Sequence, residues 1–364
     1  MVVEDPFQYP PPFLLLPAAA LQLTADYPTL RAGFFAAQTS LFVIVSLLLA
    51  VYIGGRSGRS ALLLWPLSLS AFPLLHSLQY GQVHVSIIAL SILGLLALGS
   101  GRAHLGAGCL AAATVGKLFP GVLILWLLGR RQYADVARVA AYAAGLWALS
   151  IWAFGATPTA AFFGYHLPRL QSGAAFAFGD AWPELADLVL AANHGVYGLT
   201  LKLQSLGLPA MDRTVAALFN RLCGMALALA AVYAGYRSRE SARSHQAQTW
   251  LALLGLGSLL STGAFADYVP LTATWLLTLL AVQLQKPLEF LTVGVVWFAQ
   301  YTLAFTTPIG DWFDPAVMLP VSALSAASLL GLLLWTLRTT LSAAASSKPS
   351  AHRERAARVS AVPS

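Results

Sequence analysis

The chain has 364 residues, of which 58% are hydrophobic and only 10% are charged, and its formal net charge is +7. Soluble domains carry about 25% charged residues, so this chain has too few polar side chains to cover a water-exposed globule. Its two cysteines, Cys109 and Cys223, lie far apart in apolar runs, which argues against a disulfide framework or a cysteine metal site.

Apolar blocks of helix-spanning length follow one another along the chain. A helix needs about 20 apolar residues to cross a bilayer core of ~30 Å, and lipid offers no partners to unpaired backbone groups. The sequence therefore predicts an all-α, polytopic transmembrane helix bundle with about nine full spans, at 33–54, 61–77, 83–99, 134–154, 214–236, 248–264, 268–284, 288–305 and 316–337.

Basic residues mark one side of these spans. Arg56 and Arg59 follow the first span, and Arg130 and Arg131 precede the fourth, whereas acidic residues such as Asp26 fall on the opposite side. Because basic residues favour the cytoplasm, we expect a multi-pass protein of the plasma (inner) membrane with a cytoplasmic C-terminus. The positive charge is then a topology signal, and we expect no nucleic-acid partner.

Residues 103–128 do not fit a simple span, because both of their ends fall on the cytoplasmic side. Two full crossings would need about 40 residues, so we expect a short helical hairpin with its tip at Lys117-Leu118-Phe119-Pro120. Charged side chains at membrane depth are rare and mostly functional. The alternative is that Lys117 only extends its ammonium toward the headgroups.

The predicted topology divides the chain into two parts. Residues 1–338 form the predicted transmembrane domain, which includes a large outer loop at 155–212. Residues 339–364 form a basic, Ala/Ser-rich tail that we expect to be disordered and cytoplasmic. The predicted topology places residues 1–31 on the outer side, but no membrane span precedes them in this sequence to translocate them. We therefore expect a further helix upstream of this chain.

Polar landmarks recur at the predicted outer ends of the spans. We expect them to converge on one cavity that faces away from the cytoplasm. In chain order they are Tyr9-Pro10-Pro11-Pro12-Phe13, Gln79-Tyr80-Gly81-Gln82-Val83-His84, Lys117 with Pro120, Asn193-His194-Gly195, and Ser261-Thr262-Gly263-Ala264-Phe265-Ala266-Asp267-Tyr268.

The order and spacing of these landmarks resemble glycosyltransferase family 87, the polyprenyl-phosphate-mannose-dependent α-mannosyltransferases of GT-C type. The resemblance rests on four features: the Tyr-Pro-Pro stretch, Gly81-Gln82 before a helix, Lys117-x-x-Pro120 and Asn193 before a pair of spans. The resemblance covers about Gln8 to Leu280. It implies transfer of a hexose, with inversion, from a polyprenyl-phosphate donor to a lipid or glycan acceptor at the outer face. We expect no cofactor, and no residue is assigned as a metal ligand.

The chain departs from the family pattern at several positions. The family's catalytic aspartate usually precedes the Tyr-Pro-Pro stretch by a longer interval, and here only Glu4 and Asp5 precede it. Asp5 is therefore the candidate base in this chain, although we expect the true base on the upstream segment. Asn193 is followed by His194-Gly195 where the family usually has Gln-Ser.

The chemistry of the transfer suggests further roles. Cations stabilise a departing phosphate, which suits Lys117 and Arg221, although Arg221 could instead pair with an outer acid or extend to the headgroups. Amides bind sugar hydroxyls and aromatic rings stack on sugar rings. The candidate sugar-binding and acceptor-binding residues are Gln79, Tyr80, Gln82, Asn193, His194, Asp267 and Tyr268.

These residues also have simpler interpretations. Gln82 could cap a helix, Asn193 and His194 could form a turn with Gly195, and Asp267 and Tyr268 could be ordinary interfacial residues. Two rival functions stay open at this point, a lipid or solute transporter and a non-catalytic relative that binds a carrier lipid. Transporters favour broken helices in both halves, and only one broken hairpin is predicted here.

Overall fold

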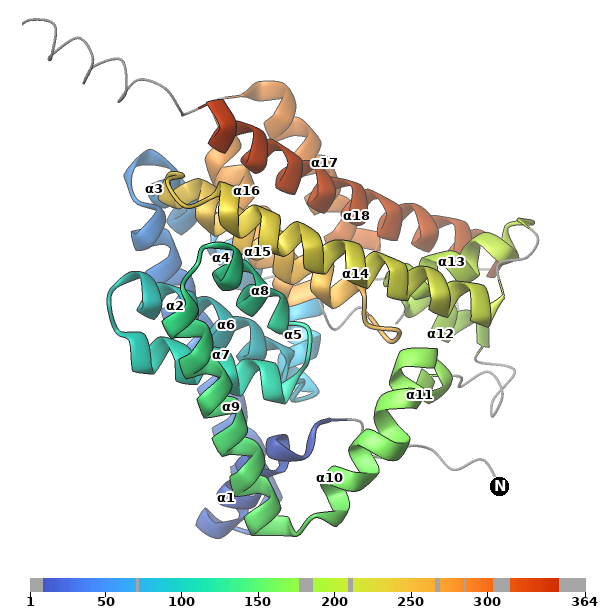
Figure 1. The fold of residues 1–364 in the computed structure, drawn as a ribbon. Helices are drawn as coiled ribbons and strands as arrows, with labels where there is room; N and C mark the ends of the chain where they lie inside the picture. The colour runs from blue at the N-terminus through green and yellow to red at the C-terminus, as the bar shows by residue number, and fades with distance from the viewer. Residues whose placement is uncertain are drawn as a thin grey trace, which may run out of the picture.

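The computed structural model describes residues 9–69, 72–176, 186–208, 212–265, 269–284, 286–303 and 315–346. Within these ranges the chain is a bundle of α-helices (Figure 1), and the predicted all-α fold is confirmed. Four of the described helices are long and apolar enough to cross a membrane, namely α2 (Tyr27–Ile53), α9 (Tyr133–Phe154), α14 (Arg213–Arg237) and α18 (Pro315–Ser346).

Shorter helices complete the described part of the bundle. They are α1 (Leu15–Leu23), α3 (Gly55–Leu64), α4 (Pro66–Leu69), α5 (Phe72–Gln79), α6 (His84–Gly99), α7 (Ala103–Gly116), α8 (Gly121–Gly129), α10 (Thr157–Ala161), α11 (Leu167–Ser172), α12 (Ala186–Ala192), α13 (Val196–Ser205), α15 (Arg243–Leu259), α16 (Val269–Gln283) and α17 (Pro287–Leu303). The predicted count of about nine full spans stays a prediction.

Side-chain caps begin two of the long helices. The carboxylate of Asp26 accepts a hydrogen bond of 3.0 Å from the Thr29 N–H at the start of α2. Asp212 accepts one of 2.8 Å from the Val215 N–H at the start of α14. Such caps satisfy amide groups that have no partner inside the helix, so Asp26 and Asp212 both have a local structural role.

The span predicted at 61–77 is not one continuous helix. α3 ends at Leu64, and α4 begins at Pro66. Proline has no N–H to continue the helical hydrogen bonds, so the ladder is interrupted at Pro66 although Trp65 itself keeps helical backbone angles. Proline therefore divides an apolar block of spanning length into short helices.

The centre of the bundle is α15. Every residue of α15 from Ala247 to Leu259 is buried, and the helix contacts α2, α8, α14, α16 and α18. A helix that is apolar on all sides belongs in the interior of a bundle. The span predicted at 248–264 ends earlier than expected, because Leu260 to Ala264 form turns instead of helix.

α2 and α6 lie side by side and run in the same direction. The hydroxyl of Ser86, in the first turn of α6, donates to Oε1 of Gln38 in the middle of α2 over 3.1 Å. At their other ends, Gly99 packs against the ring of Tyr52. The two helices therefore have the same orientation, as predicted for the first and third spans.

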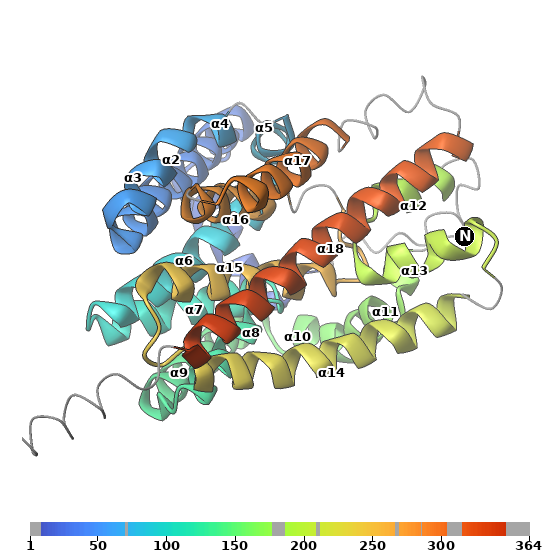
Figure 2. The same ribbon diagram turned by 90° about the horizontal axis from the view of Figure 1, so that it is seen from above.

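The predicted outer loop at 155–212 consists largely of short helices. α10 and α11 follow one another with a π-helical turn between them at Phe162–His166. α12 and α13 pack against α18, and α13 also packs against α14 (Figure 2). At the other end of the chain, α18 extends to Ser346, so residues 339–346 are helical rather than part of a disordered tail.

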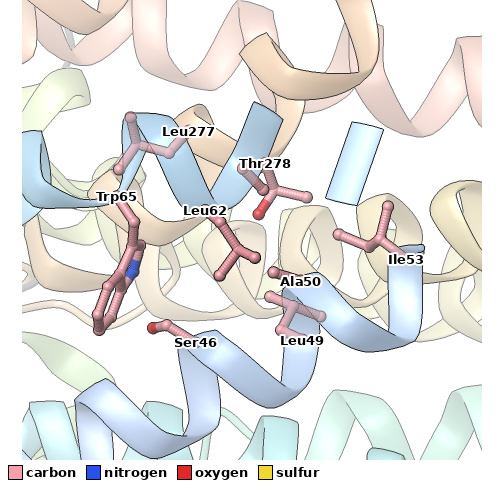
Figure 3. Close-up of a pocket in the computed structure, with 9 residues that line it drawn as sticks. Ser46, Leu49, Ala50, Ile53, Leu62, Trp65, Leu277 and Thr278 are labelled. Carbon is pink, nitrogen blue, oxygen red and sulfur yellow. The ribbon is translucent and has the colours of Figure 1, made fainter. Parts of the chain in front are cut away.

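A pocket between α2, α3 and α16 contains few polar groups (Figure 3). It is lined by Ser46, Leu49, Ala50, Ile53, Ala61, Leu62, Trp65, Leu277 and Thr278. Ile53 ends α2, and that end packs beside Gly99 at the end of α6. The pocket therefore lies toward the end of the bundle that is predicted to be cytoplasmic, away from the outer landmarks.

Candidate functional site

The predicted helical hairpin is present, and Lys117 lies at its tip. α7 ends at Gly116 and α8 begins at Gly121, while Lys117 between them has an extended backbone. Gly116 packs against α6, because a Cβ atom added at Gly116 would lie 2.6 Å from Cδ1 of Ile87. This close contact sets the end of α7 on the first turn of α6, and Lys117 follows directly.

The ammonium of Lys117 lies against His84 and Tyr9, and we call these three residues the Lys117 cluster. Nζ of Lys117 contacts Nε2 of His84, and it lies 3.5 Å from Nδ1 of the same ring. It also lies 5.2 Å from the centre of the Tyr9 ring, within the range of a cation–π contact. His84 is only 3% exposed.

Apolar side chains surround the Lys117 cluster. Val83, Ile87 and Ala113 form a small buried group, against which Tyr9, Phe13 and Phe119 pack. The rings of Tyr9 and Phe13 stack with their centres 4.8 Å apart. The Tyr-Pro-Pro stretch and the hairpin tip, which are far apart in the sequence, therefore meet at the first turn of α6.

The segment Gln79–Gln82 leads directly into the Lys117 cluster. Gly81 has a φ of 67°, a left-handed conformation that favours glycine, and the Gln82 N–H donates to the Ser77 carbonyl over 2.8 Å. Gln79 and Tyr80 are exposed and Gln82 is half-buried. The turn thus brings Gln82 within two residues of His84, at the same end of α6 as Lys117.

Asn193 is buried and joins two segments. Its side-chain amide donates to the Thr262 carbonyl over 2.7 Å, and its Oδ1 accepts from the Gly195 N–H over 3.0 Å. Its backbone pairs with Phe265 in an isolated bridge. These contacts give Asn193 the turn role considered above, and sugar binding by this residue stays a prediction.

His194 lies inside the same turn. Its backbone N–H donates to the Ala264 carbonyl over 2.8 Å, and its Nδ1 lies 3.0 Å from the Ala192 carbonyl. Burial and the nearby ammonium of Lys202 lower the pKa of His194 to about 4. The imidazole is therefore neutral at physiological pH.

Lys202 of α13 is a buried cation that the sequence analysis did not single out. It is fully buried, and its Nζ donates to the carbonyls of Ala191 and Asn193 over 3.2 and 2.6 Å and to the Ser322 hydroxyl over 2.6 Å. A lysine in a predicted outer loop looks solvated in the sequence. Only the packing of α13 against α18 reveals its burial.

The last turn of α15 lies between the Lys117 cluster and the Asn193 turn. A Cβ atom at Gly257 would lie 3.1 Å from the Phe119 carbonyl, and one at Gly195 would lie 3.0 Å from the Leu259 carbonyl. Gln82, Lys117 and Asn193 are therefore at the same end of the central helix. A single cavity that they share stays a prediction.

The remaining candidate residues lie elsewhere. Arg221 is exposed on α14, while its neighbour Asn220 is buried and donates to the Leu260 carbonyl over 2.8 Å. Since successive residues point about 100° apart around a helix, Arg221 lies on a different, exposed side of α14 from the one that contacts the end of α15 through Asn220. Asp5, Asp267 and Tyr268 lie outside the described residues.

Metal-ligating side chains do not gather in the described ranges. No three of His, Cys, Asp or Glu there are close enough together to hold a metal ion. The chemistry of the described site is that of a cation and an imidazole beside aromatic rings, at the end of a membrane bundle. Such an arrangement suits an anionic headgroup attached to an apolar chain.

A comparison with protein families agrees with this chemistry. The model of glycosyltransferase family 87 matches residues 7–262, which include the Lys117 cluster, the Gln79–Gln82 turn and the Asn193 turn. No curated protein and no solved structure matches the chain.

Proposed function

Because the chain belongs to glycosyltransferase family 87, it is a membrane glycosyltransferase, and we propose that it transfers a hexose from a polyprenyl-phosphate donor. The proposed sugar is mannose, and the proposed acceptor is a lipid or glycan at the outer face of the plasma membrane. The C-terminus is proposed to be cytoplasmic. The observation that supports this proposal is the position of the Lys117 ammonium. It lies among aromatic and apolar side chains at a hairpin tip within the bundle.

In the proposed reaction the acceptor hydroxyl oxygen attacks the anomeric carbon on the face opposite the phosphate. The bond between that carbon and the phosphate oxygen breaks, and its electron pair stays on the phosphate, so the configuration inverts. A carboxylate takes the hydroxyl proton, and Asp5 is the candidate for this role. Lys117 stabilises the charge that the phosphate gains.

The other candidate residues have supporting roles in this proposal. Gln79, Gln82 and Asn193 would bind sugar hydroxyls, and Tyr80 would stack on the sugar ring. His194, Asp267 and Tyr268 would contact the acceptor or the sugar, and Arg221 would contact the donor phosphate as it approaches along α14. The support for Gln82 is its place two residues before His84.

A transfer assay tests the proposal. Membranes with the wild-type protein are given labelled polyprenyl-phosphate mannose and, in parallel, the glucose and galactose donors. Lys117→Ala should lower the transfer rate about 100-fold, the loss typical for one group that stabilises developing charge. Gln82→Ala should weaken transfer less, by raising KM for the donor.

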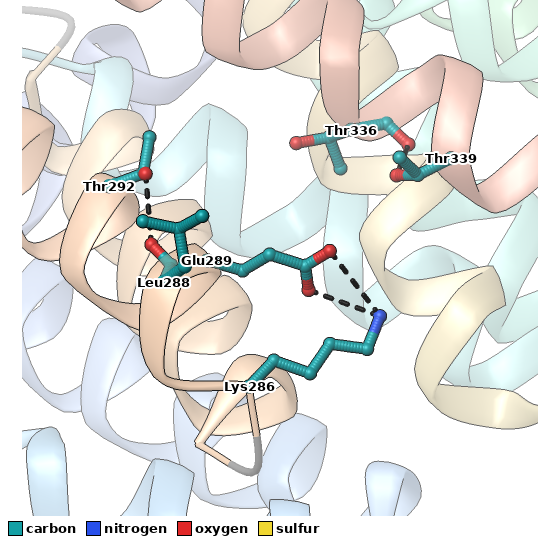
Figure 4. Close-up of polar contacts among 6 residues, drawn as sticks. All are labelled: Lys286, Leu288, Glu289, Thr292, Thr336 and Thr339. Carbon is teal, nitrogen blue, oxygen red and sulfur yellow. Dashed lines mark hydrogen bonds and ion pairs between the residues drawn. The ribbon is translucent and has the colours of Figure 1, made fainter.

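Lys286→Ala is the matched control. Lys286 is exposed just before α17, forms an ion pair of 3.1 Å with Glu289 (Figure 4) and is not part of the Lys117 cluster. The control should transfer sugar at the wild-type rate. If neither Lys117→Ala nor Gln82→Ala reduces an observed activity, the proposed site is wrong.

A further inference from the structure

The contact between His84 and Lys117 suggests a role for a residue that the proposed mechanism does not use. His84 is the first residue of α6, and Lys117 belongs to the hairpin tip between α7 and α8. We propose that His84 is a positioning residue, whose neutral imidazole accepts a hydrogen bond from Lys117 and directs the ammonium toward the donor phosphate. This inference rests on the proposed function.

The chemistry of the two groups fixes the direction of the hydrogen bond. An ammonium group only donates, so the ring nitrogen that faces it has to be an acceptor. A protonated imidazole has no acceptor and would also place two cations side by side in a buried site. His84 therefore acts here as a neutral acceptor, and the contact is not an ion pair.

Packing holds both partners in place. His84 is 3% exposed, and the close contact of Gly116 with Ile87 fixes the hairpin tip over the turn that His84 begins. The Tyr9 ring covers another side of the ammonium at 5.2 Å. Within this frame the imidazole fixes one of the three N–H groups of Lys117, and so sets the directions of the other two.

Orientation matters because a lysine side chain is long and flexible. Ordering a free lysine side chain costs rotamer entropy. A cation that is ordered before the substrate binds stabilises developing charge without reorganising during the reaction. The expected role of His84 is to supply this order, so its effect on transfer should operate only through Lys117.

A double-mutant cycle tests this dependence. His84→Leu removes the acceptor at similar volume and should lower kcat for transfer about tenfold, the size expected for losing a hydrogen bond to a charged group. In the Lys117→Ala background the same change should cost less than about twofold. Equal losses in the two backgrounds would show that His84 acts independently of Lys117 and overturn the inference.

Two further variants separate positioning from folding. His84→Gln restores an acceptor oxygen on a side chain of similar reach, and it should recover transfer to within about threefold of the wild type. His104→Leu is the matched control, because His104 is exposed at the other end of α7 and contacts Tyr142 over 3.2 Å. A His84→Gln variant as weak as His84→Leu would contradict the inference.

A second measurement needs no transfer activity. Acetylation of the Lys117 amine in detergent is followed by peptide mass spectrometry, with Lys286 as the internal standard. His84→Leu should speed acetylation of Lys117 several-fold, because the neutral amine is the reactive form, and His84→Gln should not. If Lys117 reacts alike in all variants, the inference fails. A wild type that transfers no sugar would count against the proposed function alone.

Discussion

The ammonium of Lys202 is the most completely buried cation among the described residues outside the spans. Burying a charge is costly unless hydrogen bonds compensate. Three oxygen acceptors from α12, the Asn193 turn and α18 provide that compensation. Burial nevertheless lowers the pKa of Lys202 to about 7, well below the 10.5 of a free lysine.

The lowered pKa predicts that stability depends on pH. Between pH 7 and 10.5 the unfolded chain holds the Lys202 proton and the folded chain releases it, so folding becomes more favourable as the pH rises. Below pH 7 both states hold the proton, and the cost of burying the charge is present in full. In this window the free energy of unfolding rises by at most about 1.4 kcal/mol for each pH unit.

Thermal melting in detergent from pH 6.5 to 10 checks this prediction. The melting temperature of the wild type minus that of Lys202→Met should rise with pH. The same difference for Lys286→Met, at an exposed position, should stay constant. A constant difference for Lys202→Met would show that Lys202 keeps an ordinary pKa in the fold.

The sequence predicted the place of Lys117 but not its neighbours. Arginines that were predicted to be cytoplasmic lie on both sides of 103–128 and implied a short hairpin, and that expectation alone put Lys117 at the tip. His84 and Tyr9 could not be assigned to Lys117, because their contact depends on how α6, α7 and the N-terminal segment pack. Arg221 could not be placed either, since its direction around α14 depends on which face of that helix is buried.

At the scale of helices, glycines set the closest contact between α8 and α14. A Cβ atom at Gly129 would lie 1.9 Å from the Val232 carbonyl oxygen, and one at Gly235 would lie 2.0 Å from that of Trp126. Small residues let helix backbones approach closely in membranes. The indole N–H of Trp126 then donates to the Ser238 hydroxyl over 3.0 Å, which links the ends of the two helices.

This close contact predicts a strong difference between two alanine substitutions in one helix. Gly235→Ala would force the backbones of α8 and α14 apart, at a cost of about 1–3 kcal/mol or more. Gly224→Ala is the matched control on α14, because no atom lies within 4 Å of its Cβ position. Alanine is also the better helix former, by up to about 1 kcal/mol.

Melting temperatures in detergent again provide the measurement. Gly235→Ala should melt several degrees below the wild type, while Gly224→Ala should melt at the same temperature or above. Equal melting temperatures for the two variants would mean that α8 and α14 are farther apart than the structure places them.

Helices were predictable from the sequence where an apolar block has no interruption. The block at 134–154 became α9 and that at 214–236 became α14, within one residue at each end. The block at 61–77 is also apolar but contains Pro66, where the helix is interrupted. Hydropathy measures transfer to lipid, whereas continuity of a helix depends on backbone hydrogen bonds, so the two need not agree.

For the whole molecule, α15 explains why distant landmarks come together. Its last turn contacts the hairpin tip through Gly257 and the Asn193 turn through Leu259. The sequence indicated only that these landmarks share one side of the membrane, through the sorting of charges. It could not indicate which helix lies between them, because every apolar block looks equally suited to the centre.

We expect this end of the bundle to face outward, and labelling from one side of the membrane tests that orientation. Cys109 and Cys223 are first replaced by alanine, and a single cysteine is then introduced at exposed positions. Gln204→Cys on α13 should react with a membrane-impermeant maleimide in intact cells, whereas Ser100→Cys, which follows α6, should react only after permeabilisation. A donor in the outer leaflet could reach Lys117 only in this orientation, so the reverse labelling pattern would require a cytoplasmic donor and a different proposal.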